Sequence, residues 1–148
     1  MIRIQMNPIA ICAEIEILEA AAPEAGATSI FIGRVRSDEG LTALTLEHFP
    51  ELAETSLARL EAQARNRWPL EEVRLIHRAG KMVPGDAIVF VGACAAHRHV
   101  AIEAVHFLMD HVKVDGPFWK KEHRPGADKW VEPRASDDVA AANWKTRQ

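Results

Sequence analysis

The chain has 148 residues, of which 48% are hydrophobic and 26% charged, the proportions of an ordinary soluble globular protein. Its net charge of −3 is too small to indicate nucleic acid or a membrane surface as the main partner. No apolar run is long enough to span a membrane, and the N-terminus lacks the layout of a signal peptide. Two cysteines without a C-x-x-C pair argue against a disulfide framework or a structural zinc cluster. These properties predict a cytoplasmic protein with a single domain over residues 1–148.

The first half of the chain predicts three strands and two helices. Strands are indicated by alternating or β-branched residues, with an interruption or a bulge at Gly33, and helices by apolar residues at helical spacing. The turn "SDEG" separates the second and third strands, which suggests that they form a hairpin. The predicted strands are residues 2–6, 27–36 and 41–49, and the predicted helices are residues 11–22 and 51–68.

The second half repeats the mixture of strands and helices. The stretch "DAIVFVGACAA" is almost continuously apolar, which places it at the centre of a sheet. A helix from about Ser136, with Ser136 as its cap, should end the chain. The predicted strands are residues 71–80, 86–96, 117–122 and 129–132, and a further helix spans residues 99–112. Tight turns between strands predict an α+β fold with a mixed, largely antiparallel sheet and packed helices.

Two arginines close the second predicted strand in "GRVR". Arg34 and Arg36 are two residues apart, so on a strand both side chains point to one face. Paired guanidinium groups can bind phosphate or carboxylate through bidentate hydrogen bonds. A solvated strand edge that resists aggregation explains the same residues equally well.

The sequence "AAHRH" lies where the central apolar strand gives way to a helix. Backbone N–H groups at a helix start favour anions, Arg98 adds a fixed charge, and His97 can exchange a proton near neutral pH. A capped turn is the structural alternative. A metal site of Cys94, His97 and His99 is a weaker one, because only three candidate ligands occur in the stretch.

The segment "KVDGPFWKKE" carries three lysines around a Gly-Pro turn. Lys113 falls in the last turn of a predicted helix, where a cation complements the helix dipole. Lys120 and Lys121 follow on a short strand and therefore lie on opposite faces. A lysine near other cations has a lowered pKa and can act as an acid, a base or a nucleophile. If the strands converge, these lysines and the other cations form a pocket for a small phosphorylated ligand.

Six blocks in order resemble the large, catalytic subunit of molybdopterin synthase. They are "FIGRVR", "LTLEHFP", "ARNRWPLEEVRLIHRAGKMVPGD", "AAHRHVAIEA", "LMDHVKVDGPFWKKE" and "DKWVEPRASD", and they span nearly the whole chain. The resemblance implies a hammerhead-like α+β fold. It also implies a sulfurtransferase that uses no cofactor or metal and converts cyclic pyranopterin monophosphate into molybdopterin. The implied partner is a small ubiquitin-like sulfur carrier with a Gly-Gly thiocarboxylate tail, bound to a homodimer of large subunits within a heterotetramer.

The resemblance also implies roles for individual residues. Lys113 and Lys120 match the family's catalytic lysines, with proton transfer or a covalent role expected of Lys113 and charge stabilisation of Lys120. The matched substrate-binding residues are Arg34, Val35, Arg36, His97, Arg98, Lys121, Glu122 and Arg134.

Two departures concern loops rather than matched residues. The loop after Arg36 is short, and "FPE" replaces the family's Tyr-Pro-Gly. A non-catalytic binding module that kept the fold, and a metal-dependent hydrolase, are the alternatives to a sulfurtransferase.

Overall fold

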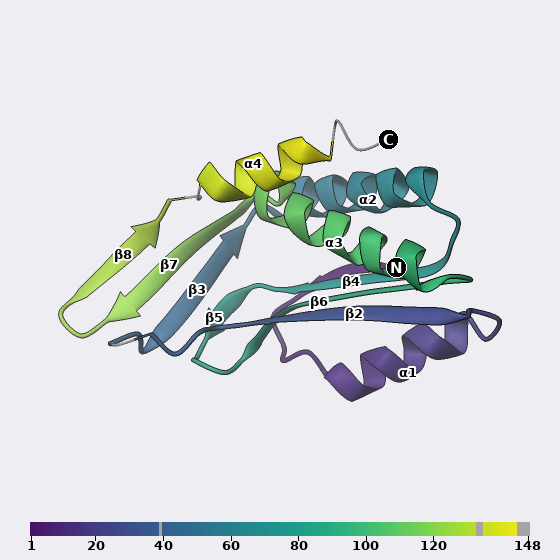
Figure 1. Ribbon diagram of the computed structural model, residues 1–148. Helices are drawn as coiled ribbons and strands as arrows, with labels where there is room; N and C mark the ends of the chain where they lie inside the picture. Colours follow the sequence, from purple (N-terminus) through teal and green to yellow (C-terminus); the bar gives the residue numbers. More distant parts are fainter. Residues whose placement is uncertain (39, 133–134, 145–148) are drawn as a thin grey trace.

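The computed structural model describes residues 1–38, 40–132 and 135–144, and its ribbon is drawn in Figure 1. In this part of the chain, strands and helices follow the mixed order that the sequence predicts. They are β1 (Ile2–Gln5), α1 (Ile11–Ala21), β2 (Ala27–Arg34), β3 (Ala43–His48), α2 (Pro50–Arg67), β4 (Leu70–Arg78), β5 (Gly80–Met82), β6 (Ala87–Ala95), α3 (Arg98–Asp115), β7 (Phe118–Arg124), β8 (Ala127–Val131) and α4 (Ala135–Asn143).

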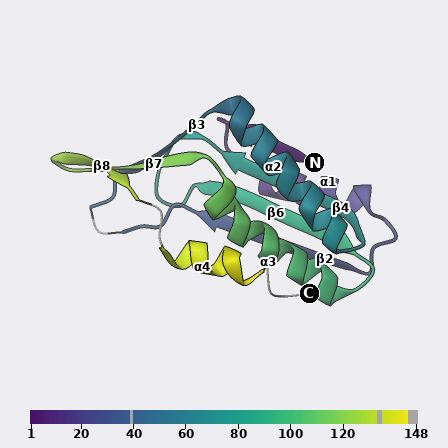
Figure 2. The same ribbon diagram turned by 90° about the horizontal axis from the view of Figure 1, so that it is seen from above.

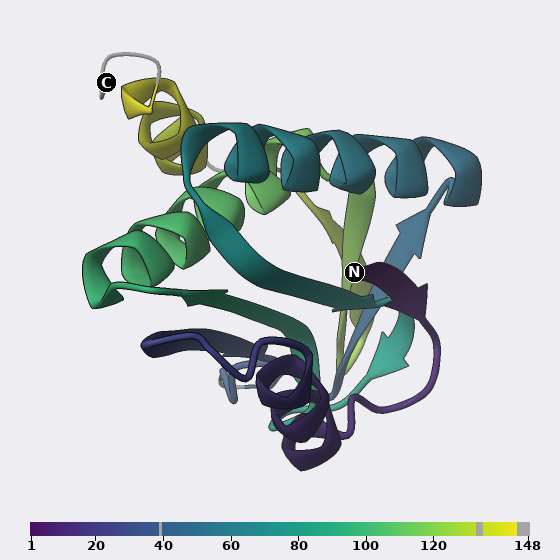
Figure 3. The same cartoon turned by 90° about the vertical axis from the view of Figure 1, so that its right-hand side faces the viewer.

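The strands form two four-stranded sheets. The first sheet has the order β1-β4-β6-β2, with β1 parallel to β4 and the other pairs antiparallel. The apolar strand β6 lies inside it, as its composition predicts. Helices α2 and α3 cover one face of this sheet and α1 covers the other (Figure 3). The bulge predicted at Gly33 is confirmed, because the register between β2 and β6 shifts between Gly33 and Arg34.

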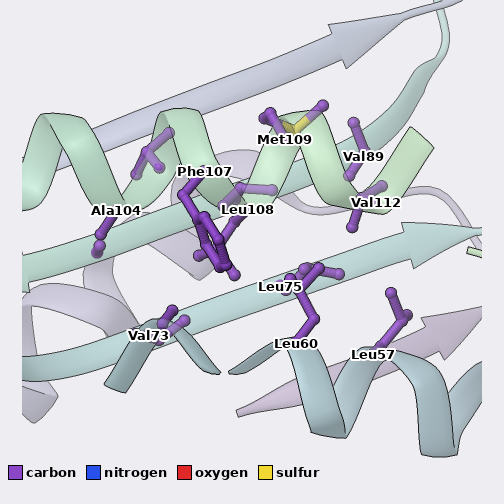
Figure 4. Close-up of a cluster of buried hydrophobic side chains, with 14 of the residues drawn as sticks. Leu57, Leu60, Val73, Leu75, Val89, Ala104, Phe107, Leu108, Met109 and Val112 are labelled. Carbon is purple, nitrogen blue, oxygen red and sulfur yellow. The ribbon is translucent and has the colours of Figure 1, made fainter. Parts of the chain in front are cut away.

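The main core lies between the first sheet and helices α2 and α3. Alternate residues of β4 and β6, such as Val73, Leu75 and Val91, point toward the helices. Leu60 of α2 and Leu108 of α3 pack on them and are almost completely buried (Figure 4). Burial of so many apolar side chains makes this region the principal source of stability.

Helix α1 packs on the opposite face of the first sheet. Gly92 of β6 allows this contact, since a Cβ there would lie 2.4 Å from a methyl carbon of Leu18. Glu14 of α1 is buried beside Arg74 of β4 and also binds Arg3. Burial alone would raise the pKa of Glu14, but the hydrogen bonds and charges of both arginines outweigh it, so the pKa is lowered.

The second sheet has the order β5-β3-β7-β8, and all its pairs are antiparallel. The hairpin β7–β8 extends away from the helices (Figure 2). The smaller core beneath the sheet consists of Val35, Leu44, Leu46 and Met82. The predicted hairpin between the second and third strands is wrong, because β2 and β3 lie in different sheets. Hydrophobic alternation locates a strand but does not specify its partner.

Smaller differences concern one strand and one helix end. Residues 80–82 form the short strand β5, where the sequence predicts the last residue of a strand and the start of a plain turn. Helix α4 begins at Ala135, so Ser136 lies inside it and the prediction that Ser136 precedes the helix as its cap is wrong. Within residues 1–38, 40–132 and 135–144, no helix is both long and apolar enough to cross a bilayer.

Candidate active site

Residues 34–36, here called the arginine strip, are held in place by the turn between β5 and β6. The N–H of Val35 donates to the carbonyl of Asp86 at 2.9 Å, and the N–H of Gly85 donates to the carbonyl of Val35 at 2.9 Å. The guanidinium of Arg34 donates to the carbonyl of Gly85 at 3.0 Å. Gly85 has a φ of 94°, which a residue with a side chain adopts only with strain. The backbone that carries Arg34 and Arg36 is therefore held in place.

A small cavity of about 50 Å³ joins this strip to β7. Arg34 lines it from the end of β2, Arg36 lines it from the segment that follows, and Lys120 and Glu122 line it from β7. The remaining lining residues are Val35, Asp38, Leu41, Leu44 and Ile88. Positive side chains from two distant segments thus face one cavity, which suits the binding of an anion.

Strand β7 separates its two lysines onto opposite faces. Lys120 Nζ lies 3.4 Å from a carboxylate oxygen of Glu122, on the side of the cavity. Lys121 faces the other way, where it contacts Asp128 at 3.3 Å and the ring of Trp130. The structure therefore joins Lys120 to the arginines and leaves Lys121 outside the cavity.

Lys113 lies in the last turn of α3, as predicted. Its ammonium is 3.8 Å from Asp137 of α4, its side chain is half exposed, and it does not line the small cavity. The helix ends at Asp115, and at the next residue, Gly116, a Cβ would lie 2.4 Å from the carbonyl oxygen of Val112. Glycine therefore permits the tight passage from α3 into β7 that connects Lys113 with Lys120.

The first residue of β7 is anchored by a ring contact. Phe118 stacks on His77 of β4, with ring centroids 4.0 Å apart and planes inclined by 16°. His77 is buried, and this burial lowers its pKa to about 4, so the ring is neutral at pH 7. The neutral imidazole ties the segment between the two lysines to the first sheet.

His97 and Arg98 lie far from these groups. Both are exposed at the start of α3, whereas Lys113 is in its last turn. Fifteen residues of helix separate Arg98 from Lys113 by about 22 Å. Within one chain, therefore, the predicted His-Arg pair does not meet the predicted catalytic lysine. Arg134 falls outside the described residues.

A larger cavity of about 550 Å³ lies between α2, α3 and α4. Five of the predicted site residues line the small cavity and none lines the larger one, so the small cavity is the candidate site. The larger cavity nevertheless adjoins Lys113, because the next two residues, Val114 and Asp115, line it. Its charged lining residues are Arg59 and Arg67 of α2, Asp115 of α3 and Asp138 of α4.

The alternative metal ligands do not share an environment. Cys94 is buried beneath α1, where its thiol contacts Thr28 and the carbonyl of Leu18, and burial raises its pKa. His97 and His99 are exposed, with ring centroids 5.9 Å apart. In the part of the chain that the structure describes, no group of three His, Cys, Asp or Glu side chains could hold a metal ion.

The structure adds three polar residues that the sequence reasoning missed. Asp38 lines the small cavity, Asp137 pairs with Lys113, and Arg124 binds Glu122. Arg124 was recognisable in principle, because it follows Lys120 by four positions on a strand and therefore shares its face. The positions of Asp38 and Asp137 depend on tertiary contacts that no local pattern indicates.

Comparison with known proteins identifies the family. The model of the family described as MoaE protein matches residues 4–115. The molybdopterin synthase catalytic subunit of Escherichia coli is 50% identical over 128 residues, which cover 84% of this chain and 85% of that protein. The catalytic subunit of Mesorhizobium japonicum is 45% identical over 148 residues, with 98% and 93% covered.

Solved structures agree with this assignment. The MoaE protein of Burkholderia ambifaria has a TM-score of 0.85 at 40% identity, over 98% of this chain and 97% of that one, which confirms the predicted α+β fold. A structure titled molybdopterin synthase from Staphylococcus aureus has a TM-score of 0.80 at 26% identity, over 87% and 95% of the two chains. The chain therefore belongs to the MoaE protein family, the sulfurtransferase catalytic subunits of molybdopterin synthase in molybdenum cofactor biosynthesis.

Proposed function

We propose that this chain takes sulfur from the thiocarboxylated C-terminus of a small ubiquitin-like carrier and inserts it into cyclic pyranopterin monophosphate, forming the dithiolene of molybdopterin. The observation that carries the proposal is the small cavity, where Arg34, Arg36 and Lys120 converge although the whole chain has a net charge of −3. A local excess of positive charge fits a phosphorylated substrate.

The proposed chemistry needs cations at this place. Opening a cyclic phosphate leaves additional negative charge on the departing oxygen, and fixed cations stabilise it in the transition state. The attacking thiocarboxylate is also an anion, so its approach to the phosphate requires positive compensation. Arg34 and Arg36 bind the phosphate in this proposal, Lys120 stabilises the developing charge, and Lys113 is the proton donor or nucleophile.

The carrier tail requires a separate path to Lys113. We place it in the larger cavity between α2, α3 and α4, because Val114 and Asp115, the residues that follow Lys113, line that cavity. A solved structure from Helicobacter pylori is described as a complex of subunits 1 and 2 of molybdopterin-converting factor. We propose a corresponding complex with a small subunit for this chain, in the cytoplasm.

A second copy of the chain is proposed to complete each site. His97 and Arg98 lie about 22 Å along α3 from Lys113, so they cannot serve the same substrate as Lys113 of their own chain. In a homodimer, the pair from one copy can reach the cavity of the other. To test this arrangement, a chain that carries both His97→Ala and Arg98→Ala is mixed with a chain that carries Lys113→Ala. Each hybrid dimer would contain one intact site, so the mixture should regain molybdopterin formation.

The direct test is reconstitution. Purified protein, thiocarboxylated carrier and cyclic pyranopterin monophosphate should yield molybdopterin, and Lys113→Ala should reduce its formation by at least about a hundredfold. A protein that binds the carrier but forms no product would be a binding module instead. Normal turnover by Lys113→Ala would reject the role given to that lysine.

A further inference from the structure

Three charged residues alternate along one face of β7. Lys120, Glu122 and Arg124 are spaced two apart, so their side chains point in the same direction. One oxygen of Glu122, Oε1, lies 3.4 Å from Lys120 Nζ. The other, Oε2, accepts hydrogen bonds from Nε of Arg124 at 3.3 Å and from Nη2 at 3.0 Å. Glu122 thus bridges the two cations with separate oxygens.

This bridge affects an anion site directly, because Glu122 and Lys120 both line the small cavity. A carboxylate there opposes the binding of a negative substrate and attracts the lysine that the substrate needs. The guanidinium group of Arg124 offsets the charge of Glu122 and fixes the orientation of its carboxylate. Glu122 is also the less exposed partner, with 16% of its side chain accessible against 35% for Arg124.

We propose that Arg124 is a positioning residue of this active site: it orients the carboxylate of Glu122 and offsets its charge, which keeps the cavity attractive to an anion. The proposal rests on the proposed function for its substrate. Arg124 itself does not line the small cavity, and its contact with Glu122 connects it to a residue that does.

Substitution of Arg124 should weaken substrate binding more than chemistry. We expect Arg124→Gln to raise KM for cyclic pyranopterin monophosphate about tenfold and to change kcat less than about threefold, since a charge-assisted contact is lost beside the substrate site. Arg124→Lys should reverse part of this rise in KM, because lysine restores the positive charge but not the paired N–H donors of the guanidinium group. An unchanged KM in Arg124→Gln would overturn the proposal.

Lys129 provides a matched control for charge. It is the cross-strand neighbour of Glu122 on β8, yet among the described residues it forms no ion pair with that glutamate. Lys129→Gln therefore removes one positive charge at a similar place without breaking the bridge. An equal rise in KM in Lys129→Gln would show a general charge effect and overturn the proposal.

A double-mutant cycle tests whether Arg124 acts through Glu122. In a Glu122→Gln background, Arg124→Gln should raise KM no more than Lys129→Gln does, because the carboxylate that Arg124 orients is gone. A full tenfold effect in that background would mean direct action on the substrate and would contradict the proposal.

A titration without turnover separates this proposal from the proposed function. Burial tends to raise the pKa of Glu122, but the Arg124 hydrogen bond and the charge of Lys120 outweigh it and lower the pKa. NMR titration of the Glu122 carboxyl should show a higher pKa in Arg124→Gln than in the wild type. Lack of product with wild-type protein would reject the proposed function alone, whereas an unchanged Glu122 pKa would reject the bridge.

Discussion

The two sheets of this protein have different surroundings and different roles. The first sheet is covered on both faces by helices, and its core contains the largest set of buried apolar side chains. The second sheet packs on a small core, and Trp119 and Trp130 on its other face are about half exposed. The cations of the candidate site lie where the sheets meet and on β7. Stability and chemistry are therefore expected to respond to different substitutions.

The largest loss of stability should come from the core of the first sheet. Leu60 of α2 is 1% exposed, and Leu60→Ala should lower the free energy of unfolding by about 4 kcal/mol through lost burial and an unfilled cavity. Leu52→Ala is the control on the same helix, because Leu52 is 53% exposed and should change stability by less than about 0.5 kcal/mol. Denaturant unfolding measures both, and equal effects would contradict the assigned core.

Protonation of His77, which stacks on Phe118 between the two sheets, should make the protein less stable in acid. The pKa of His77 is about 4 when folded against 6.5 ordinarily, so the unfolded chain binds more protons between these values. Stability should therefore fall by about 3 kcal/mol as the pH drops from about 6.5 to about 4. His77→Phe keeps an aromatic ring beside Phe118 and should remove this part of the pH dependence. The same slope in both proteins would rule out His77 as its cause.

Loss of the buried ion pair under α1 should have a smaller effect. Glu14→Gln leaves the buried guanidinium of Arg74 without its countercharge but retains an acceptor, so we expect a loss of about 2 kcal/mol. Glu16→Gln is the control, since Glu16 is an exposed residue of the same helix. Thermal unfolding of both variants distinguishes a buried pair from a general change in helix charge.

The sequence predicted the first sheet better than the second. Continuous apolar residues located β6 inside a sheet, and helical spacing located α2 and α3, because local pattern and tertiary environment agree there. The hairpin of β2 and β3 failed because strand pairing depends on contacts between distant residues. Similarly, spacing indicated Arg34 and Arg36 as a pair of cations, but the cavity that they share with Lys120 required the fold. The distance of His97 from Lys113, in contrast, already follows from the length of the predicted helix between them.

Lys120→Ala tests the separation of stability and chemistry most directly, with unfolding and molybdopterin formation measured on the same preparation. Lys120 is partly exposed on β7, so its loss should change the free energy of unfolding by less than about 0.5 kcal/mol. Product formation should nevertheless fall at least about a hundredfold, because the transition state loses a stabilising charge. Full turnover, or a loss of stability similar to that of Leu60→Ala, would contradict the account.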